Sequence, residues 1–533
     1  MRDGTQLATD LYGADAGGRR PVLLMRTPYN KEAVAVTAQR YAAAGYVVVV
    51  QDVRGRYASP GSSLPYNNEG QDGFDTLEWI GRQAWSAGRV GMWGSSHVGA
   101  VQWQAAAEGG YGLAVLCPTA TWSSFYRNIY AGGAARLALI AQAAAGRVKP
   151  PEGISPPSDW GQTLLHLPLA NMDGAIGWPL PWLAGILSHP RPDGFWKRLD
   201  LTKEVEQLKL PVQHVVGYYD FFSRETVGNF MRRRSPEDQL ILGPWDHGTI
   251  GKSKVGDVDF GPAAQMDLAG ENLAWFDRHL KKPATAPFPR VRYFSMGELA
   301  WRTSDGWPPA GTSEVPFYLH SKGRANTRRG DGRLTREAPS TAEPADTFSA
   351  DPADPAPAVP ESKAHPRYAA IWGPVDQTAN ADRPDVLVYD MPLREPLLFA
   401  GPIRAELWVS ADTPDADWVV KLIDVRPDGF AQNLAAGIQR GSFRESELKP
   451  APIEPGRTYR LNVDMAHAAA RLEAGHTLRV EIAGAYFPLY DRNTNTAEGP
   501  FGSRTRIATE KVLHTPGAAS RVILPLLDSA RPN

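Results

Sequence analysis

The chain has 533 residues, of which 42% are hydrophobic and 22% are charged, and its formal net charge at pH 7 is -1. This length exceeds what one hydrophobic core normally holds, so it predicts several domains. A net charge near zero excludes the strongly basic composition of proteins that bind DNA, RNA or anionic membranes. The single cysteine, Cys117, excludes an intrachain disulfide and a cysteine-based zinc site, and its apolar surroundings indicate a buried thiol.

The beginning of the chain has no apolar signal core, and no stretch reaches the roughly 18 apolar residues of a membrane span. We therefore expect a cytoplasmic protein without a membrane partner. The basic run 232–234 is interpreted as a solvated helix face rather than a binding site. The sequence offers no test of self-association, so a homo-oligomer stays open.

The first part of the chain alternates between predicted strands and predicted helices. Short apolar runs that are rich in β-branched residues predict buried parallel strands at 21–25, 46–50, around Val90, and at 113–117, 212–216 and 239–242. Helices are predicted over 30–44, 70–83 and 98–108. This alternation indicates an α/β sheet, whose ligands bind at the carboxyl ends of the strands.

A glycine-flanked serine, Ser96, follows the Val90 strand and precedes a helix, which is the pattern of a nucleophile elbow. Gly94 lies two residues before it and Gly99 three after, whereas the common pattern has glycine where this chain has Val98. Ser95 is the alternative nucleophile, but the bulky Trp93 two residues before it favours Ser96.

The last two predicted strands of the α/β region each end in a candidate partner for this serine. Asp220 follows one and His247 follows the next, which is the chain order Ser, Asp, His of α/β-hydrolases. Asp246 is adjacent to His247 and poorly placed to bind its ring. His97 is an alternative base, although its position directly after the nucleophile favours a role for its backbone N–H.

Six segments stand out in order along the chain: Met1-Arg2-Asp3-Gly4-Thr5-Gln6-Leu7-Ala8-Thr9-Asp10, Arg26-Thr27-Pro28-Tyr29, Gln51-Asp52-Val53-Arg54-Gly55, Gly91-Met92-Trp93-Gly94-Ser95-Ser96, Gly217-Tyr218-Tyr219-Asp220 and Gly243-Pro244-Trp245-Asp246-His247. In order and spacing they resemble the cocaine-esterase, α-amino-acid ester hydrolase and X-Pro dipeptidyl-peptidase superfamily. The resemblance extends over nearly the whole chain. Because the first segment begins at Met1, the possibility stays open that a leader or a few strand residues precede this sequence.

The resemblance implies an α/β-hydrolase core at 1–120 and 201–290, a helical cap inserted at 121–200, and a C-terminal β jelly-roll domain at 291–533. It also implies a triad of Ser96, Asp220 and His247, with an oxyanion hole formed by the Tyr29 hydroxyl and the His97 N–H. Residue 97 is commonly tyrosine in this family, so histidine here affects the pocket shape more than the backbone donor. Independently, a phenol just after the first strand, stiffened by Pro28, is a suitable donor to a developing oxyanion.

The cap region contains several tryptophans, which suit a lid over an apolar pocket. We expect Trp160, Trp178 and Trp182 to contribute to substrate binding, although packing of the cap is the simpler alternative for each ring. Phe221 and Phe222 directly follow Asp220 and are expected near the acyl group, with Phe222 favoured by the resemblance.

Beyond residue 290 the pattern is that of an antiparallel β structure without alternating helices. The Pro- and Ala-rich stretch 338–366 is predicted to be ordered but irregular. Paired aspartates at 415–417 and 424–428 lack the ligand spacing of a calcium loop, so turn chemistry explains them and no metal is expected.

These observations predict a serine hydrolase that needs no cofactor and cleaves small carboxylic esters through an acyl-enzyme on Ser96. The alternative is an aminoacyl ester or amide hydrolase or a dipeptidyl-peptidase, which needs acidic residues to hold a substrate ammonium. Glu152, Asp159 and Asp173 of the cap are candidates for this, but their spacing does not bring them together. A remote alternative is a non-enzymatic binding protein on a hydrolase fold.

Overall fold

The computed structural model describes residues 1–62, 66–281 and 288–527. A nine-stranded sheet forms the first part of the molecule, in the order β1-β3-β2-β4-β5-β8-β9-β12-β13. Its strands are β1 (Thr9–Tyr12), β2 (Arg20–Thr27), β3 (Val47–Asp52), β4 (Ser86–Ser95), β5 (Leu113–Thr119), β8 (Gln213–Gly217), β9 (Gln239–Gly243), β12 (Val291–Ser295) and β13 (Ala300–Ser304). The pairs from β3 to β12 are parallel, and only β1 and β13 at the two edges pair antiparallel.

Helices cover both faces of this sheet, as the unbroken apolar strands require. On one face α1 (Ala35–Ala43) and α11 (Leu268–Leu280) pack against Leu23, Val48 and Val50. On the other face α2 (Glu69–Gly81), α3 (His97–Glu108) and α9 (Thr202–Gln207) pack against the alternate strand residues, whose side chains point to this face, such as Val22 and Leu24. The remaining core helix, α10 (Ser223–Arg233), follows β8 directly. The predicted α/β core is confirmed, including the strands that carry the elbow and the triad candidates.

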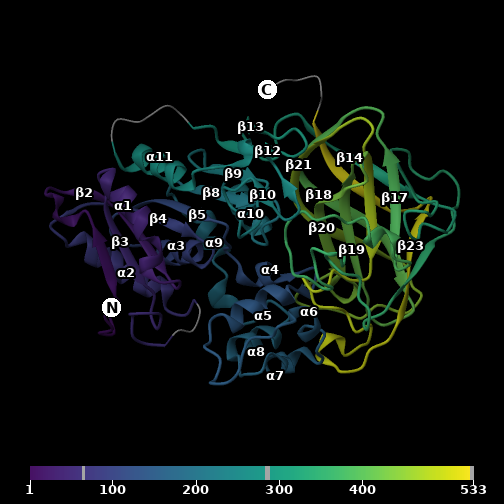
Figure 1. Ribbon diagram of the computed structural model, residues 1–533, viewed down its shortest axis with the longest axis horizontal. Helices are drawn as coiled ribbons and strands as arrows, with labels where there is room; N and C mark the ends of the chain where they lie inside the picture. Colours follow the sequence, from purple (N-terminus) through teal and green to yellow (C-terminus); the bar gives the residue numbers. More distant parts are fainter. Residues whose placement is uncertain (63–65, 282–287, 528–533) are drawn as a thin grey trace.

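Between β5 and β8 the chain leaves the sheet and forms a layer of short helices and one small hairpin. Its elements are α4 (Phe125–Ile129), β6 (Tyr130–Ala131), β7 (Ala134–Ala135), α5 (Leu137–Ala145), α6 (Trp160–Thr163), α7 (Met172–Ile176) and α8 (Pro181–Leu187). In Figure 1 these helices lie below the sheet and beside the β domain. Within the described residues, no helix is both long enough and apolar enough to cross a membrane.

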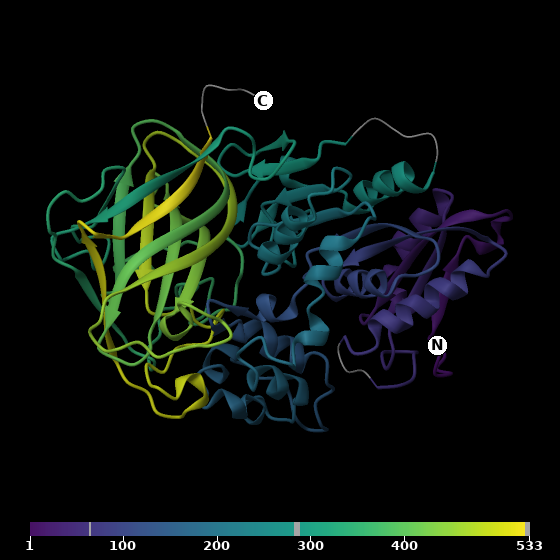
Figure 2. The ribbon, with the colours of Figure 1, turned by 180° about the vertical axis from the view of Figure 1, so that it is seen from behind.

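The C-terminal part is β-rich, as predicted. Its large sheet contains β14 (Thr312–His320), β15 (Arg333–Thr335), β16 (Asp346–Ala350), β17 (Val386–Pro392), β18 (Leu397–Ala411), β19 (Asp417–Val425), β20 (Ala431–Arg440), β21 (Tyr459–Leu472), β22 (Thr477–Ala483), β23 (Ala508–Thr515), β24 (Ala518–Ala519) and β25 (Arg521–Leu527). A separate hairpin, β10 (Lys254–Val255) and β11 (Val258–Asp259), lies in the loop after β9. Figure 2 shows the long strands curving around one another. The stretch 338–366 is irregular apart from the short β16, which pairs with β23.

The two large sheets do not divide at the expected position 290/291. Strand β12 begins at Val291 and pairs in parallel with β9, and β13 extends the same sheet by an antiparallel pair. The α/β sheet therefore continues to Ser304, beyond the expected core boundary. The boundary was predicted too early because the β12–β13 hairpin at the edge of the α/β sheet has the same local sequence pattern as the first hairpin of an antiparallel domain.

Candidate active site

Ser96 occupies a strained turn between β4 and α3. Its backbone has φ 62° and ψ -126°, a conformation that non-glycine residues rarely adopt and that is typical of a nucleophile elbow. The backbone N–H of Ser96 is held by the carbonyls of Thr119 and Ala120, and Thr121 Oγ1 donates to its carbonyl at 2.9 Å. The surrounding structure thus fixes the turn and leaves the serine hydroxyl at the carboxyl end of the sheet.

The two glycines around the elbow are required by close approaches. Gly94 has φ +129°, and a Cβ there would lie 2.2 Å from Val98 Cγ1. A Cβ at Gly99 would lie 2.7 Å from the Cβ of Thr121. In this variant elbow, therefore, the close approach of the helix falls at residue 99 instead of 98 and is made to the segment after β5, while Val98 fills the space beside Gly94.

Asp220 and His247 meet above neighbouring strand ends. Asp220 follows β8, His247 follows β9, and His247 Nδ1 lies 2.9 Å from Asp220 Oδ2. The other carboxylate oxygen accepts a hydrogen bond from Phe222 N at 2.8 Å, so the buried carboxylate is held at both oxygens. Asp246 instead accepts hydrogen bonds from Gly248 N and Thr249 Oγ1 within its own turn.

The electrostatics of this pair suit a general base. Burial lowers the pKa of His247, but the charge of Asp220 and the hydrogen bond to it outweigh this effect and leave the pKa above its ordinary value. Because Nδ1 is occupied by Asp220, Nε2 is the nitrogen available to a nucleophile. Among the hydrogen bonds of the described residues, none joins Ser96 Oγ to His247; such contacts often tighten only when substrate binds.

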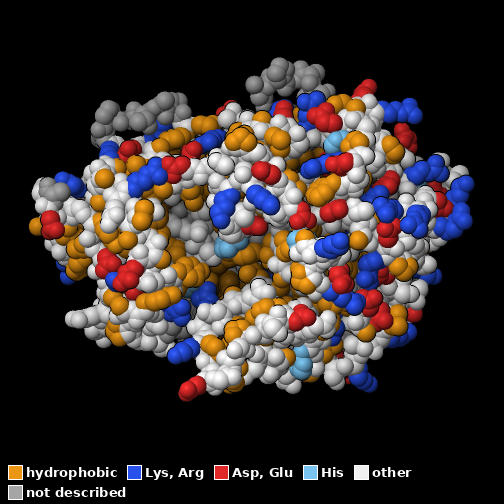
Figure 3. Space-filling view, in the orientation of Figure 1, with side chains coloured by type: hydrophobic (Ala, Val, Ile, Leu, Met, Phe, Trp, Pro, Cys, Tyr) orange, Lys and Arg blue, Asp and Glu red, His pale blue; other side chains and the backbone are white. Residues whose placement is uncertain are grey.

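Ser96 and His247 line one cavity of about 360 Å³. Figure 3 shows the face of the molecule that is seen in Figure 1. This face is hollowed near its centre, and hydrophobic side chains surround the hollow. The other residues that line the cavity come from the core loops and the cap: Pro28, Tyr29, Arg56, Tyr57, Tyr66, Phe125, Asn128, Ile129, Leu139, Ile140, Ala143, Gly146, Arg147, Trp182, Phe221 and Phe222.

The structure brings together most of the residues that the sequence singled out. Tyr29, Phe221, Phe222 and Trp182 all line the cavity of Ser96 and His247. The Phe221 and Phe222 rings lie 4.4 Å and 5.2 Å from the His247 ring, so they form an apolar wall beside the base.

Two of the expected cap residues lie elsewhere. Trp178 is buried within the packing of the cap, and Trp160 packs against the same cluster at its edge; neither lines the cavity. The cap carboxylates are also absent from the cavity wall: Asp159 caps α6, Asp173 accepts from Gly174 N, and Glu152 is exposed.

His97 has its ring turned into the protein. The Nε2 atom lies 3.3 Å from Glu69 Oε1, Nδ1 lies 3.3 Å from Arg147 Nη1, and the Tyr66 ring packs against the imidazole at 4.2 Å. Burial lowers the pKa of His97 to about 4, so the ring is neutral at pH 7. Its backbone N–H is at the first position of α3, where helix donors have no partner within the helix.

Sequence reasoning missed the arginines of this site. Arg56 follows β3 and Arg147 follows α5, and both line the cavity. Arg136, at the start of α5, donates to the carbonyls of Phe221 and Asn128 and so holds the apolar wall in place. No motif marks these positions, because Arg56 lies in a loop and Arg136 and Arg147 flank a cap helix whose packing against the core is not visible in the local sequence.

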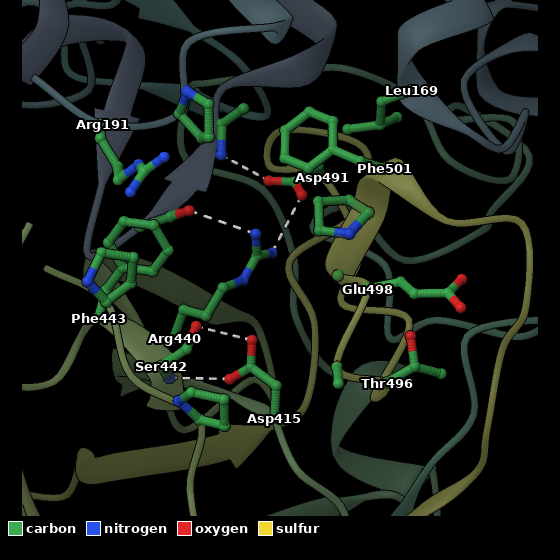
Figure 4. A pocket seen from close by; sticks show the side chains of 18 of the residues that line it. Leu169, Arg191, Asp415, Arg440, Ser442, Phe443, Asp491, Thr496, Glu498 and Phe501 are labelled. Carbon is green, nitrogen blue, oxygen red and sulfur yellow. Dashed lines mark hydrogen bonds and ion pairs between the residues drawn. The ribbon is translucent and has the colours of Figure 1, made fainter. Parts of the chain in front are cut away.

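A second cavity of about 360 Å³ lies between the cap and the β domain, away from the elbow. Figure 4 shows Arg440 at its wall with its guanidinium bonded to Asp491. The buried guanidinium also pairs with Asp417 at 2.8 Å. Asp415 accepts hydrogen bonds from Ser442, and burial raises the pKa of Asp415 to about 6. The charged and polar groups of this wall are paired with one another. We therefore interpret this cavity as the space left where the cap packs against the β domain.

Comparison with known proteins agrees with this geometry. Residues 3–249 match the X-Pro dipeptidyl-peptidase (S15 family) model, and residues 285–523 match the X-Pro dipeptidyl-peptidase C-terminal non-catalytic domain. The chain is 35% identical to the cocaine esterase of Rhodococcus sp. (strain MB1 Bresler), over 99% of this chain and 97% of that protein.

Two solved structures share the whole architecture. An aminopeptidase from a marine sediment Thaumarchaeota archaeon superposes with a TM-score of 0.87 at 26% identity, covering 99% of this chain and 95% of that one. An α-amino acid ester hydrolase superposes with a TM-score of 0.84 at 26% identity and the same coverage. The chain therefore belongs to the cocaine esterase and X-Pro dipeptidyl-peptidase (S15) family of α/β serine hydrolases.

Proposed function

We propose that this protein is an esterase that hydrolyses small-molecule carboxylic esters, with Ser96 as nucleophile, His247 as general base and Asp220 as its partner. The observation that carries the proposal is the shared cavity: a strained, partly buried serine and a histidine bonded to a buried aspartate lie in one hollow with an apolar wall. That combination supports acyl transfer better than binding alone, because strained backbone conformations cluster at active sites and a base lies in the same cavity as the strained serine.

In the proposed mechanism, Ser96 Oγ attacks the ester carbonyl carbon while His247 Nε2 takes its proton. The negative charge that develops on the carbonyl oxygen is stabilised by the Tyr29 hydroxyl and the His97 N–H. The alcohol leaves with the proton from His247, and the acyl group remains on Ser96. Water then attacks the acyl-enzyme, His247 takes its proton, and the acid is released as Ser96 regains a proton.

The similar solved structures include an aminopeptidase and an α-amino acid ester hydrolase, but the cavity of this chain favours esters without an α-ammonium. The part of the cavity wall that the structure describes contains no aspartate or glutamate. A buried ammonium without a carboxylate partner is costly. The apolar wall of Phe221 and Phe222 instead suits an aromatic or alkyl acyl group.

This preference is tested by comparing kcat/KM for 4-nitrophenyl acetate and phenylacetate with that for the 4-nitrophenyl esters of glycine and phenylglycine, which add only an α-amine, with the Ser96→Ala variant as the blank. We expect the acyl esters to be hydrolysed faster than the substrates with a free α-amine. A reversed order would contradict the esterase assignment and indicate an ammonium site that the cavity wall does not reveal.

Replacing Tyr29 with phenylalanine is expected to lower kcat by about a hundredfold to a thousandfold, the usual effect of removing one oxyanion donor. KM should change little, because the charge develops only in the transition state. Steady-state kinetics with a neutral ester measures both constants. Tyr111→Phe, which removes an exposed hydroxyl beyond the far end of α3, is the matched control, and equal kinetics of the two variants would remove Tyr29 from the oxyanion hole.

A further inference from the structure

Two arginines from different parts of the chain converge on the cavity of Ser96. Arg56 lies in the loop after β3, and Arg147 follows the cap helix α5. They touch each other: Arg56 Nη1 donates to the backbone carbonyl of Arg147 at 3.1 Å. The core and the cap therefore each contribute one cation to the same side of the site.

Each guanidinium is oriented by neutral groups. Arg147 Nη1 donates to Nδ1 of His97 at 3.3 Å, and the guanidinium carbon lies 5.2 Å from the Trp182 ring and 5.8 Å from the Tyr66 ring. Arg56 Nε donates to the carbonyl of Pro28 at 3.2 Å, directly before Tyr29. Within the described residues, Nη2 of Arg56 has no hydrogen-bond partner in the protein. The Arg147 guanidinium has a side-chain hydrogen bond with Tyr66 besides the one to His97, and its remaining N–H donors are available to a ligand.

Neither arginine forms an ion pair with a carboxylate in the described part of the chain, although the charge of Arg147 helps to lower the pKa of Glu69. Glu69 lies on the far side of the His97 ring, where it binds His97 Nε2 and, at 3.1 Å, the buried Arg26. Asp220 lies behind His247, with its two oxygens bonded to His247 and Phe222 N. The charged side chains that line the cavity, apart from His247, are thus two cations and no anion.

Arginine presents a planar set of N–H donors that matches a carboxylate, and a water-restricted cleft lined by one sign of charge concentrates ligands of the opposite sign. We propose that the substrate of this enzyme is an ester that carries a second, free carboxylate, and that Arg56 and Arg147 bind that carboxylate while Ser96 attacks the ester. This inference rests on the proposed esterase function and adds the substrate class to it.

The carboxylate can belong to the acyl part or to the alcohol part of the ester, and paired substrates distinguish the two. On the acyl arm, the mono-4-nitrophenyl ester of terephthalic acid is compared with 4-nitrophenyl 4-carbamoylbenzoate. On the alcohol arm, the acetate ester of 4-hydroxybenzoic acid is compared with that of 4-hydroxybenzamide. In each pair only the charge changes, since a carboxamide has nearly the shape of a carboxylate.

On at least one arm, the wild-type protein should favour the carboxylate over the carboxamide in kcat/KM by about tenfold or more, the value of a charge-assisted hydrogen bond. Most of this preference should appear in KM, and added NaCl should reduce it. A carboxylate-to-carboxamide ratio of one or less on both arms would overturn the carboxylate site.

Arg56→Gln and Arg147→Gln should each lower this ratio by about tenfold, and Arg147→Lys, which keeps the charge but not the planar donors, should lower it less. The carboxylate-to-carboxamide ratio is taken within each variant. If the loss of Arg147 disturbs His97 and lowers activity on both esters equally, that effect cancels in the ratio. Arg191→Gln, an exposed cap arginine at the second cavity, is the matched control and should leave the ratio unchanged. If Arg147→Gln does not fold, as thermal unfolding will show, Arg56→Gln and the salt dependence of the wild-type ratio still decide the question.

A ratio that is unchanged in both glutamine variants, with equal losses on charged and neutral esters, would overturn the proposal and assign the arginines to stabilisation of the oxyanion. Failure of the esterase proposal looks different, because then none of the four esters would show hydrolysis that depends on Ser96. Turnover of the neutral esters without charge preference would contradict the carboxylate site alone.

Discussion

Replacing Ser96 with alanine is expected to abolish ester hydrolysis, with a loss of about a millionfold in kcat, as for other serine triads that lose their nucleophile. The change removes only Oγ, the atom that forms the acyl-enzyme. The hydrogen bonds that hold the turn use the backbone of Ser96, so they are retained in the variant. Burst-phase and steady-state kinetics with a 4-nitrophenyl ester measure the loss.

Alanine at Ser96 is also strained at a positive φ, so the variant must be shown to fold by circular dichroism and thermal unfolding. The matched control is Ser95→Ala, which removes the neighbouring exposed hydroxyl and should retain wild-type activity. A folded Ser96→Ala protein with undiminished turnover, or a larger loss in Ser95→Ala, would contradict the assignment of the nucleophile.

Replacing Asp220 with asparagine is expected to lower kcat/KM by about ten-thousandfold, because an amide no longer selects the histidine tautomer with a free Nε2. The pH profile should shift as well. In the wild type the base must be neutral, so activity rises with pH through the pKa of His247, which Asp220 holds above its ordinary value. Without that charge, burial dominates and lowers the pKa of His247, and the rising limb of the residual activity moves to lower pH.

Asp246→Asn is the matched control for this prediction. Asp246 is adjacent to His247 but its carboxylate accepts hydrogen bonds within its own turn, and its charge has a smaller effect on the pKa of His247 than that of Asp220. Activity should stay close to wild type, with at most a slight shift of the profile. A larger loss in Asp246→Asn than in Asp220→Asn would exchange the roles of the two aspartates.

The α/β core was predictable because its strands are short, fully buried and rich in valine, as in Val47–Asp52, and because glycines mark the elbow. The pairing of Asp220 with His247 was predictable for a related reason. Both residues directly follow neighbouring parallel strands, which brings them to the same edge of the sheet. At these positions the local sequence pattern and the order of the strands in the sheet both point to the same arrangement of the site.

The cavity wall was less predictable, because it depends on how separate segments pack. Arg56 and Arg147 are 91 residues apart and meet only when the cap folds over the core. Trp182 lies on the short helix α8 and reaches the cavity, whereas Trp178 lies in the bend before that helix and is buried in the cap. Composition identified an aromatic cap but not which of its rings faces the substrate.

The most direct test of the account is the site of covalent labelling by a fluorophosphonate, followed by peptide mass spectrometry. We expect one adduct on Ser96, which is lost in Ser96→Ala and retained in Ser95→Ala. Labelling should rise with pH through the pKa of His247 and be slowed by Asp220→Asn. An adduct on Ser95, or no adduct on a protein that is shown to be folded, would contradict the claim that Ser96, His247 and Asp220 form the catalytic centre.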